Sequence, residues 1–344
     1  MMSNILAGEL SRRFKLDESG IYASDSEGYW SNLSKEENVL LLRLLKTLSA
    51  KEALLRLKPD LVDIVYSPMR DAGLELLELN GDETCIDYGC MWGALTVALA
   101  RRTAFVLGID QTKSSLNLLK SRVKDENLNN IELLCADLRK LPVLDFKVDI
   151  AIANGVLEWI PERGLIELKN YFGKYNKKEI QNNPGIEQLE FLQNAYKNIK
   201  PAGKLYLGIE NRYDFKMFLG VGDPHVNIPC VSFFPRRLSS AISVLLLGRP
   251  YVNWLYSFKG TEVLLKKAGF SKVDLYMCFP DYRFPERIIP YNKGLDDFTP
   301  TINLKNSAGK ITPKRFLGRV AETLIFKIIK AKFLSPSIIA IAHK

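Results

Sequence analysis

The sequence predicts an α/β protein built on a doubly wound parallel sheet. From residue 84 onward, short apolar segments typical of strands alternate with helical segments, which is the pattern of a parallel sheet covered by helices on both faces. One of these strand segments, residues 148–153, is almost continuously apolar, as expected for a strand buried on both faces. Apolar residues make up 47% and charged residues 25% of the 344 residues, a balance typical of globular domains rather than disordered chains.

The first part of the chain has the signals of helix N-termini. Two capping boxes, each a serine followed three residues later by a glutamate, predict helices that begin after Ser34 and Ser49. Ser67 places a cap residue before a proline at the first helical position. We therefore predict an N-terminal helical cap over residues 1–66 and a main domain over residues 67–344.

The main domain alternates strands and helices in a regular order. Strands are predicted at residues 84–88, 104–109, 131–135, 148–153, 204–209, 271–278 and 337–342. Helices are predicted at residues 94–102, 114–123, 186–199, 261–268 and 314–333. Two insertions, at residues 211–258 and 279–336, interrupt this order, and we expect one sheet with two insertions rather than two separate sheets.

Composition excludes several classes of protein. The five cysteines are odd in number and never spaced as CxxC, which excludes a disulfide scaffold. No apolar run approaches the ~20 residues that a membrane span needs, and the nearest, residues 241–247, is far shorter. The N-terminus has no continuous apolar segment typical of a signal peptide. The expected location is the cytoplasm.

A glycine turn follows the first strand of the main domain. The strand ends at Asp87, and Gly89-Cys90-Met91-Trp92-Gly93 leads into a helix, so that a ligand can approach the backbone closely at the helix N-terminus. Acidic side chains end the next two strands: Asp110 is placed to accept both hydroxyls of a ribose, and Asp137 to accept a hydrogen bond from an adenine amino group. Asn154 ends the fourth strand. Each of these residues can also cap a helix, but four at consecutive strand ends favour a ligand site.

The turn lacks the features of a phosphate-binding loop. A dinucleotide fingerprint requires G-x-G-x-x-G, and the second and third glycines are replaced here by Met91 and Ala94. The Gly-Lys-Ser/Thr end of a Walker loop is absent. The pattern that remains indicates an adenosyl ligand without a phosphate cradle.

The same segments resemble those of class I S-adenosylmethionine-dependent methyltransferases over roughly residues 65–210 and the last strand. The matching segments read CIDYGCMWG, VLGID, CADL, DIAIANGVLEWI and IKPAGKLYLGIENR. The resemblance implies a Rossmann-like, seven-stranded sheet with an antiparallel last strand, methyl-transfer activity and S-adenosylmethionine as the cofactor. One departure is Met91, which stands where the family often has a glycine.

The resemblance also implies roles for individual residues. Asp87, Gly89 and Gly93 would border the methionine moiety, Asp110 the ribose and Asp137 the adenine. We include four of their neighbours in the predicted cofactor site: Cys90, Gln111, Leu138 and Asn154.

A narrower resemblance covers residues 205–290. IENRYDFKMFLGVGDPH and FPDYRFP are similar to segments of methyltransferases associated with bacterial cell-surface polysaccharide assembly. This resemblance implies that the acceptor is a sugar hydroxyl of a surface-polysaccharide precursor. The predicted acceptor-binding residues are Asn211, Arg212, Asp281 and Tyr282.

Methyl transfer to a hydroxyl needs a base near the acceptor. His225 follows Asp223-Pro224 in the first insertion, and imidazole is suited to this role at neutral pH; the alternative is a structural loop histidine. Glu210 can position the acceptor or take its proton, although it can equally pair with Arg212 or a backbone amide. Because the carboxylates are scattered along the chain and His343 adjoins the C-terminus, we expect no metal site.

The basic charge of the chain is concentrated in its last part. Residues 211–344 contain 21 Lys and Arg against 9 Asp and Glu, a net +12, whereas the whole chain carries +9. If the insertions face the acceptor, this excess predicts an anionic acceptor such as a nucleotide-sugar, a phosphorylated glycan or a diphosphate-linked lipid. We find no RNA-binding motif and no Asn-Pro-Pro-Tyr signature, although an RNA or protein methyltransferase and a non-catalytic cofactor-binding subunit remain alternatives.

The basic helix predicted at residues 314–333 has an apolar stripe. Core packing is the interpretation that such a stripe favours. The alternative is peripheral contact with an anionic membrane surface, which would suit a lipid-linked acceptor. The stripe consists of Phe316, Leu317, Val320, Leu324, Ile328 and Ile329. The sequence predicts no particular oligomeric state.

Overall fold

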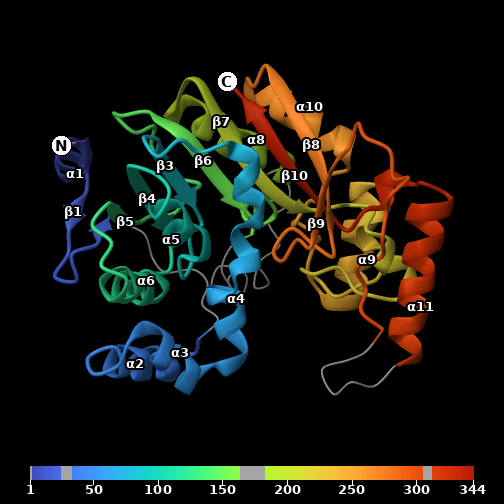
Figure 1. The fold of residues 1–344 in the computed structure, drawn as a ribbon, viewed down its shortest axis with the longest axis horizontal. Helices are drawn as coiled ribbons and strands as arrows, with labels where there is room; N and C mark the ends of the chain where they lie inside the picture. The colour runs from blue at the N-terminus through green and yellow to red at the C-terminus, as the bar shows by residue number, and fades with distance from the viewer. Residues whose placement is uncertain (1, 25–32, 163–182, 305–311) are drawn as a thin grey trace.

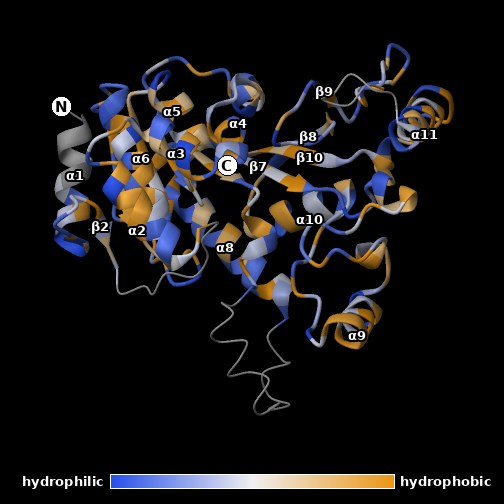
Figure 2. Cartoon of the chain, turned by 90° about the horizontal axis from the view of Figure 1, so that it is seen from below, coloured by the Kyte–Doolittle hydropathy of each residue, from blue (hydrophilic) through white to orange (hydrophobic). Residues whose placement is uncertain are grey.

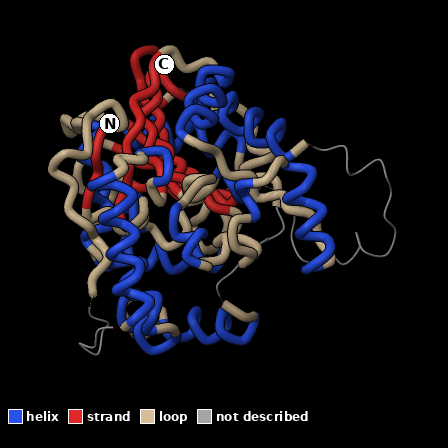
Figure 3. The backbone as a smooth tube through the Cα atoms, turned by 90° about the vertical axis from the view of Figure 1, so that its right-hand side faces the viewer, coloured by secondary structure: helices blue, strands red, loops and turns tan. Residues whose placement is uncertain are grey.

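A computed structural model describes residues 2–24, 33–162, 183–304 and 312–344 (Figure 1). Its strands form one mixed sheet in the order β1-β2-β5-β4-β3-β6-β7-β10-β8-β9. Helices lie on both sides of the strands, as Figure 3 shows. The predicted Rossmann-like α/β architecture is confirmed.

The five central strands run parallel. They are β3 (Thr84–Tyr88), β4 (Phe105–Asp110), β5 (Ile131–Cys135), β6 (Val148–Asn154) and β7 (Ile199–Glu210). Most of their residues are buried, as expected for strands that are covered by helices on both faces. Their carboxyl ends therefore share one edge of the sheet, where parallel α/β proteins bind ligands.

The last strand is antiparallel to its neighbours. β10 (Ser337–His343) lies between β7 and β8 (Lys272–Phe279), and Ser337 is opposite both Glu210 and Cys278. Because β10 is antiparallel to both, β8 runs in the same direction as β7. The two insertions thus leave the sheet at the edge where the central strands end.

The prediction of seven strands is wrong, because the sheet has three more at its edges. β1 (Lys15–Leu16) and β2 (Tyr22–Ala23) extend the sheet next to β5, and β9 (Arg287–Pro290) extends it next to β8. The first two strands contain only two residues each, which is too few for a period-two pattern to show in the sequence. The N-terminal segment is therefore not purely helical.

The first group of helices precedes residue 163 in the chain and packs around the central strands. Of these, α2 and α3 lie below α6 in Figure 1. The group consists of α1 (Met2–Arg13), α2 (Lys35–Leu44), α3 (Ala50–Leu57), η1 (Pro59–Leu61), α4 (Val62–Tyr66), the 3₁₀ helix η2 (Pro68–Leu77), α5 (Ala94–Ala100), α6 (Lys113–Asp125) and η3 (Leu157–Trp159).

The later helices include one that the sequence did not predict, α9, in the first insertion. They are α8 (Pro184–Asn198), η5 (Phe215–Leu219), η6 (Val231–Phe233), α9 (Arg236–Leu247), α10 (Phe258–Ala268), α11 (Pro313–Glu322), the π-helix η7 (Thr323–Ile328) and η8 (Lys332–Leu334). The single basic helix predicted at 314–333 is thus divided among α11, η7 and η8.

Both predicted capping boxes are confirmed. The Ser49 side chain accepts a hydrogen bond from the Glu52 N–H, and the Glu52 carboxylate accepts one from the Ser49 N–H. The next amide of this helix, at Ala50, donates to Asp125 on α6 at 2.6 Å, so the cap also joins α3 to the sheet domain.

We expect Ser49→Ala to lower the free energy of unfolding by about 1 kcal/mol, the usual cost of losing an N-cap side chain. Urea denaturation measures the change. A matched control is Thr47→Ala, whose hydroxyl lies before the cap and donates to the Leu44 carbonyl at 3.4 Å. An equal effect of both substitutions would contradict the capping role.

The apolar stripe of the C-terminal helix is exposed, so core packing is the wrong interpretation. The buried residues of α11 and η7 are Gly318, Glu322 and Phe326, at a spacing of four residues, and Ala321 and Ile325 pack beside them. The six stripe residues are 47–67% exposed. The sequence pattern identified the apolar face of the helix, but it did not show whether that face points to the core or to solvent.

No helix within the described ranges combines the length and the apolar character needed to cross a bilayer.

Candidate active site

A cavity of about 440 Å³ opens at the carboxyl edge of the central strands. Its wall combines the glycine turn, the ends of β4 to β7, residues of α4 and η2, and the first insertion. Many of the predicted site residues line it: Asp87, Gly89, Cys90, Asp110, Gln111, Asp137, Leu138, Asn154, Glu210, His225 and Tyr282. The strand ends named from the sequence therefore converge on one cavity.

The glycine turn has the backbone geometry of a close-approach loop. Gly89 has φ of 70°, and a Cβ there would lie 2.5 Å from Cγ2 of Val156. Met91 also adopts a left-handed conformation, with φ of 49°, and its N–H donates to Oδ2 of Asp110 at 2.9 Å. Met91 thus keeps the conformation that a glycine would adopt. Gly93 caps α5 against Leu119 and does not line the cavity.

Asp87 is a buried carboxyl at the start of this turn. Burial raises its pKa to about 7, although the hydroxyl of Thr96 donates to Oδ2 at 2.7 Å and opposes the shift. Asp110 adds to the rise, and Arg70 opposes it. A cationic group bound in the cavity would hold Asp87 in its ionised form.

Asp110 and Asp137 occupy different surroundings. Burial raises the pKa of Asp110 against the hydrogen bonds from the Thr112 and Met91 amides, and each oxygen keeps capacity to accept another bond. Burial also acts to raise the pKa of Asp137, but its two-pronged ion pair with Arg139 outweighs burial and lowers it. Asp110 is therefore the better placed of the two to receive hydroxyl donors.

Two glutamates and a histidine meet beside the cavity. One side-chain ligand atom each of Glu158, Glu210 and His225 lies within 4.8 Å of the others, a cluster that has the residue types to hold a metal ion. The expectation that the carboxylates are scattered is therefore wrong. Glu158 and Glu210 are far apart in sequence, but they follow and end the adjacent strands β6 and β7.

The two carboxyl groups have unequal surroundings. Glu158 is fully buried, and neither of its oxygens accepts a hydrogen bond from the residues that the structure describes. Burial, and then the charge of Glu210, raise the pKa of Glu158 well above its usual range. Glu210 lines the cavity and accepts a hydrogen bond from the Tyr282 hydroxyl at 3.3 Å. Glu210 is therefore the carboxylate that a bound acceptor would meet.

His225 is held in place by its neighbours. Its Nδ1 lies 3.3 Å from Oδ1 of Asp223, whose other oxygen accepts the Tyr251 hydroxyl at 3.0 Å. The ring lies edge-on to Trp159, with centroids 4.8 Å apart. With Nδ1 turned toward Asp223, Nε2 is the nitrogen left for chemistry in the cavity.

We expect the acid limb of the pH–rate profile to lie above that of an ordinary imidazole. Burial acts to lower the pKa of His225, but the hydrogen bond with Asp223 and the charges of Glu210, Asp223 and Glu162 outweigh it and raise the pKa. A base must be neutral to accept a proton, so activity is lost as the pH falls through this raised pKa.

Asp223→Asn is expected to move this limb to lower pH. The substitution removes a charge that raises the pKa of His225, while burial still acts to lower it. The pH dependence of kcat/KM for the two proteins measures the shift. A limb that stays in place would contradict the coupling between Asp223 and His225.

Three of the predicted acceptor-binding residues do not line the cavity. Asn211 is buried and donates to the carbonyls of Phe333 and Ser335, both at 2.7 Å. Arg212 donates to the carbonyls of Ser232 and Phe234, and Asp281 accepts the amides of Arg283 and Phe284. These side chains hold the backbone of the two insertions, and their predicted contact with acceptor stays a prediction.

The structure adds residues to which the sequence reasoning gave no role. Arg70, Arg139, Trp159 and Arg283 line the cavity, and Glu158 lies behind its wall. The charge of Glu158 within the apolar run Val-Leu-Glu-Trp was the one signal available for it in the sequence. Arg70 comes from η2, and nothing in its local sequence connects it to the strand ends.

Comparison with protein families gives a match to the methyltransferase domain over residues 85–171. These residues include the glycine turn and the ends of β4, β5 and β6, which form one side of the cavity. The chain is an S-adenosylmethionine-dependent methyltransferase. Its cofactor is S-adenosylmethionine.

Two curated proteins illustrate the similarity. A probable cobalt-precorrin-6B C(15)-methyltransferase (decarboxylating) of Methanococcus vannielii is 25% identical over 151 residues, which are 44% of this chain and 77% of that protein. A probable fatty acid methyltransferase of Pseudomonas putida is 29% identical over 201 residues, 56% of this chain and 47% of that protein. The chain thus spans about half the length of the second relative.

A solved structure aligns with a larger share of this chain than these two relatives do. The S-adenosylmethionine-dependent methyltransferase from Mesorhizobium loti superposes with a TM-score of 0.44 and 14% identity, covering 81% of this chain and all of that one.

Proposed function

We propose that this methyltransferase transfers a methyl group to a hydroxyl oxygen of a small acceptor, and that the acceptor is a sugar of a surface-polysaccharide precursor. The observation that carries the proposal is His225, held by Asp223 at the same cavity as Asp87 and Asp110. A proton acceptor and the cofactor-side carboxylates thus line the same cavity.

The cofactor side of the cavity fits a cationic adenosyl compound. A Cβ at Gly89 would fill the close approach of the turn, and Asp87 and Asp110 are buried carboxyls whose raised pKa values a cation would restore. When bound, S-adenosylmethionine supplies an electrophilic methyl carbon on sulfur. Asp110 would accept its ribose hydroxyls, and Asp87 would face its ammonium group.

His225 would remove the acceptor proton. When the acceptor hydroxyl is methylated, its proton would pass to Nε2 of His225. Asp223 keeps Nδ1 protonated and stabilises the imidazolium that forms. Glu210 would orient the hydroxyl by accepting a hydrogen bond from a neighbouring one.

The groups around His225 suit a polyhydroxylated ring. Glu210 and Tyr282 offer oxygen atoms to hydroxyls, and Trp159 offers an aromatic face. An anionic part of the acceptor would meet Arg70 and Arg283. The two segments that resemble polysaccharide methyltransferases contribute five residues to this wall, which supports a sugar acceptor. They are Glu210, Pro224, His225, Tyr282 and Arg283.

The test is transfer of labelled methyl from S-adenosylmethionine to a panel of acceptors. We expect label on nucleotide-sugars or on diphosphate-linked glycolipids, and a loss of turnover of about tenfold or more in Glu210→Gln. Glu262→Gln is the matched control, since this glutamate lies on α10 in an exposed pair with Lys266. Because His225 supplies the base, a chelator should leave turnover unchanged.

The other outcomes would overturn the proposal. Transfer only to RNA or to protein would assign the other acceptor classes. Cofactor binding without transfer to any acceptor would indicate a non-catalytic subunit. Loss of turnover in the chelator, restored by a divalent metal, would assign the cluster of Glu158, Glu210 and His225 to a metal ion.

A further inference from the structure

The helix α9 buries polar residues and exposes apolar ones, which is the reverse of an ordinary surface helix. Its buried residues are two serines, Ser239 and Ser243. Its exposed residues include Leu238 and the run Val244 to Leu247, in which Leu245 is 82% exposed. A surface helix normally buries its apolar face, whereas α9 turns this face to solvent, which is typical of an interaction surface.

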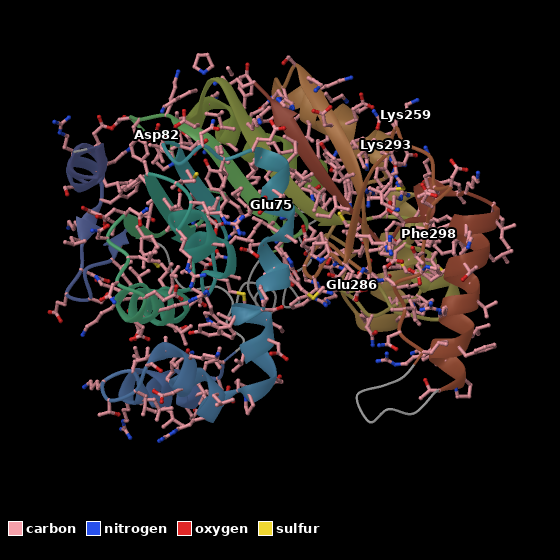
Figure 4. The ribbon with its side chains drawn as sticks, in the orientation of Figure 1. Glu75, Asp82, Lys259, Glu286, Lys293 and Phe298 are labelled. Atoms are coloured by element: carbon pink, nitrogen blue, oxygen red, sulfur yellow. The ribbon has the colours of Figure 1, made fainter. Side chains whose placement is uncertain are left out.

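The C-terminal helices show the same inversion. Gly318 and Glu322 face the protein, and Glu322 accepts hydrogen bonds from the Thr301 hydroxyl and the Ile302 amide. Phe326 anchors η7 against Phe298 and Phe279, with ring centroids 5.4 and 4.8 Å apart; Phe298 is labelled beside α11 in Figure 4. These contacts fix the helix with its apolar stripe turned outward.

The two helices lie at the same end of the molecule. Figures 1 and 2 both place α9 and α11 at the end opposite α1, and Figure 2 shows apolar residues along both helices. Between them lies η5, whose Phe218 is exposed and contacts Phe233 at a ring distance of 4.7 Å. On the other side, Phe215 of η5 contacts Phe326. We name this surface the apolar end face; its main residues are Phe218, Leu245, Leu246, Leu317, Ile328 and Ile329.

The helices at this end carry almost only positive charge, although the exposed Asp296 pairs with Lys330 beside them. α9 has no acidic residue, and the one acidic residue of α11, η7 and η8 is the buried Glu322. Exposed basic residues include Arg237 beside Leu238 and Lys327 beside Ile328. Among the basic residues after 210, Arg283 is the one that lines the cavity, so the positive excess of this part of the chain is not gathered there.

We propose that the apolar end face docks on an anionic lipid bilayer. Exposed leucine, isoleucine and phenylalanine on amphipathic helices, next to lysine and arginine and with no exposed carboxylate on the helices themselves, match the boundary between acyl chains and anionic headgroups. A protein partner or a second copy of the chain is the competing occupant. An anionic lipid surface accounts for both the exposed apolar side chains and the positive excess. This proposal is independent of the proposed reaction.

The test is flotation of the full chain with vesicles of phosphatidylcholine alone or mixed with phosphatidylglycerol. We expect the protein to float with the anionic vesicles and far less with the neutral ones. Bound protein should fall roughly tenfold in Leu245→Gln/Leu246→Gln and in Ile328→Gln/Ile329→Gln. Arg237→Gln/Lys327→Gln should reduce binding to anionic vesicles and make it less sensitive to salt.

The control is Leu40→Gln/Leu55→Gln, which removes two exposed leucines, 46% and 52% exposed, from α2 and α3. This variant should float as the parent chain does. Thermal unfolding and cofactor binding of every variant check that the fold and the distant cavity are intact.

Three results would overturn the proposal. The first is a parent chain that does not float with anionic vesicles. The second is an equal loss of flotation in the α2 and α3 control. The third is a lipid-free dimer that the apolar end-face substitutions dissociate and that anionic vesicles do not, which would assign the face to a second copy.

Discussion

His225→Ala is expected to lower turnover by about 10²–10⁴-fold, the usual contribution of a positioned general base, while S-adenosylmethionine affinity stays close to that of the parent chain. The imidazole is lost, but the cofactor-side residues Asp87 and Asp110 lie on β3 and β4, outside the insertion that holds His225. Glu210 remains near the acceptor, but it lacks the Asp223 contact that positions His225. Single-turnover transfer and calorimetric titration of the cofactor measure the two quantities separately.

His343→Ala is the matched control. His343 also pairs with an aspartate, since its Nε2 lies 2.8 Å from Asp274, but it lies on β10 and does not line the cavity. We expect unchanged turnover in this variant. Turnover in His225→Ala equal to that of the parent chain would remove His225 from the mechanism.

Asp110→Ala is expected to weaken cofactor binding by about 1–3 kcal/mol, the scale of hydrogen bonds to a charged group, or roughly 5- to 150-fold in Kd. The carboxylate would accept ribose hydroxyls, and it also fixes the amides of Met91 and Thr112. Calorimetry of the purified chain measures the affinity.

Two variants separate the causes of the Asp110 effect. Asp110→Asn keeps a carbonyl acceptor but removes the charge, so its effect should be smaller than that of alanine. Asp145→Ala removes an exposed aspartate that pairs with Arg13 and should leave the affinity unchanged. Unaltered affinity in Asp110→Ala would overturn the ribose assignment.

Much of the cofactor side could be predicted from the sequence because its residues are local to strand ends. Asp87, Asp110 and Asn154 each lie at the carboxyl end of an apolar strand, and parallel strands bring these ends to one edge. The antiparallel last strand was also predicted, through the resemblance to a known family. The edge strands β1, β2 and β9 were not, because their short pairings leave no periodic pattern.

The acceptor side was less predictable because it depends on contacts between distant segments. The pairing of β6 with β7 brings Glu158 beside Glu210, and the first insertion adds His225 to them. Neither insertion has a periodic sequence pattern from which the positions of its loops could be predicted. Asn211 and Asp281 have the polar side chains of binding residues, yet in this fold they hold backbone groups.

The sequence by itself determined the α/β class, the glycine turn, the carboxylates at the strand ends and the amphipathic character of the C-terminal helix, because each is a property of neighbouring residues. Only the tertiary structure decided which carboxylates meet His225 and which way the amphipathic helices face. Periodicity shows that a helix has an apolar side, but the direction of that side depends on its anchors. In this chain Phe326 and Glu322 bind η7 and α11 to the protein and turn the apolar side outward.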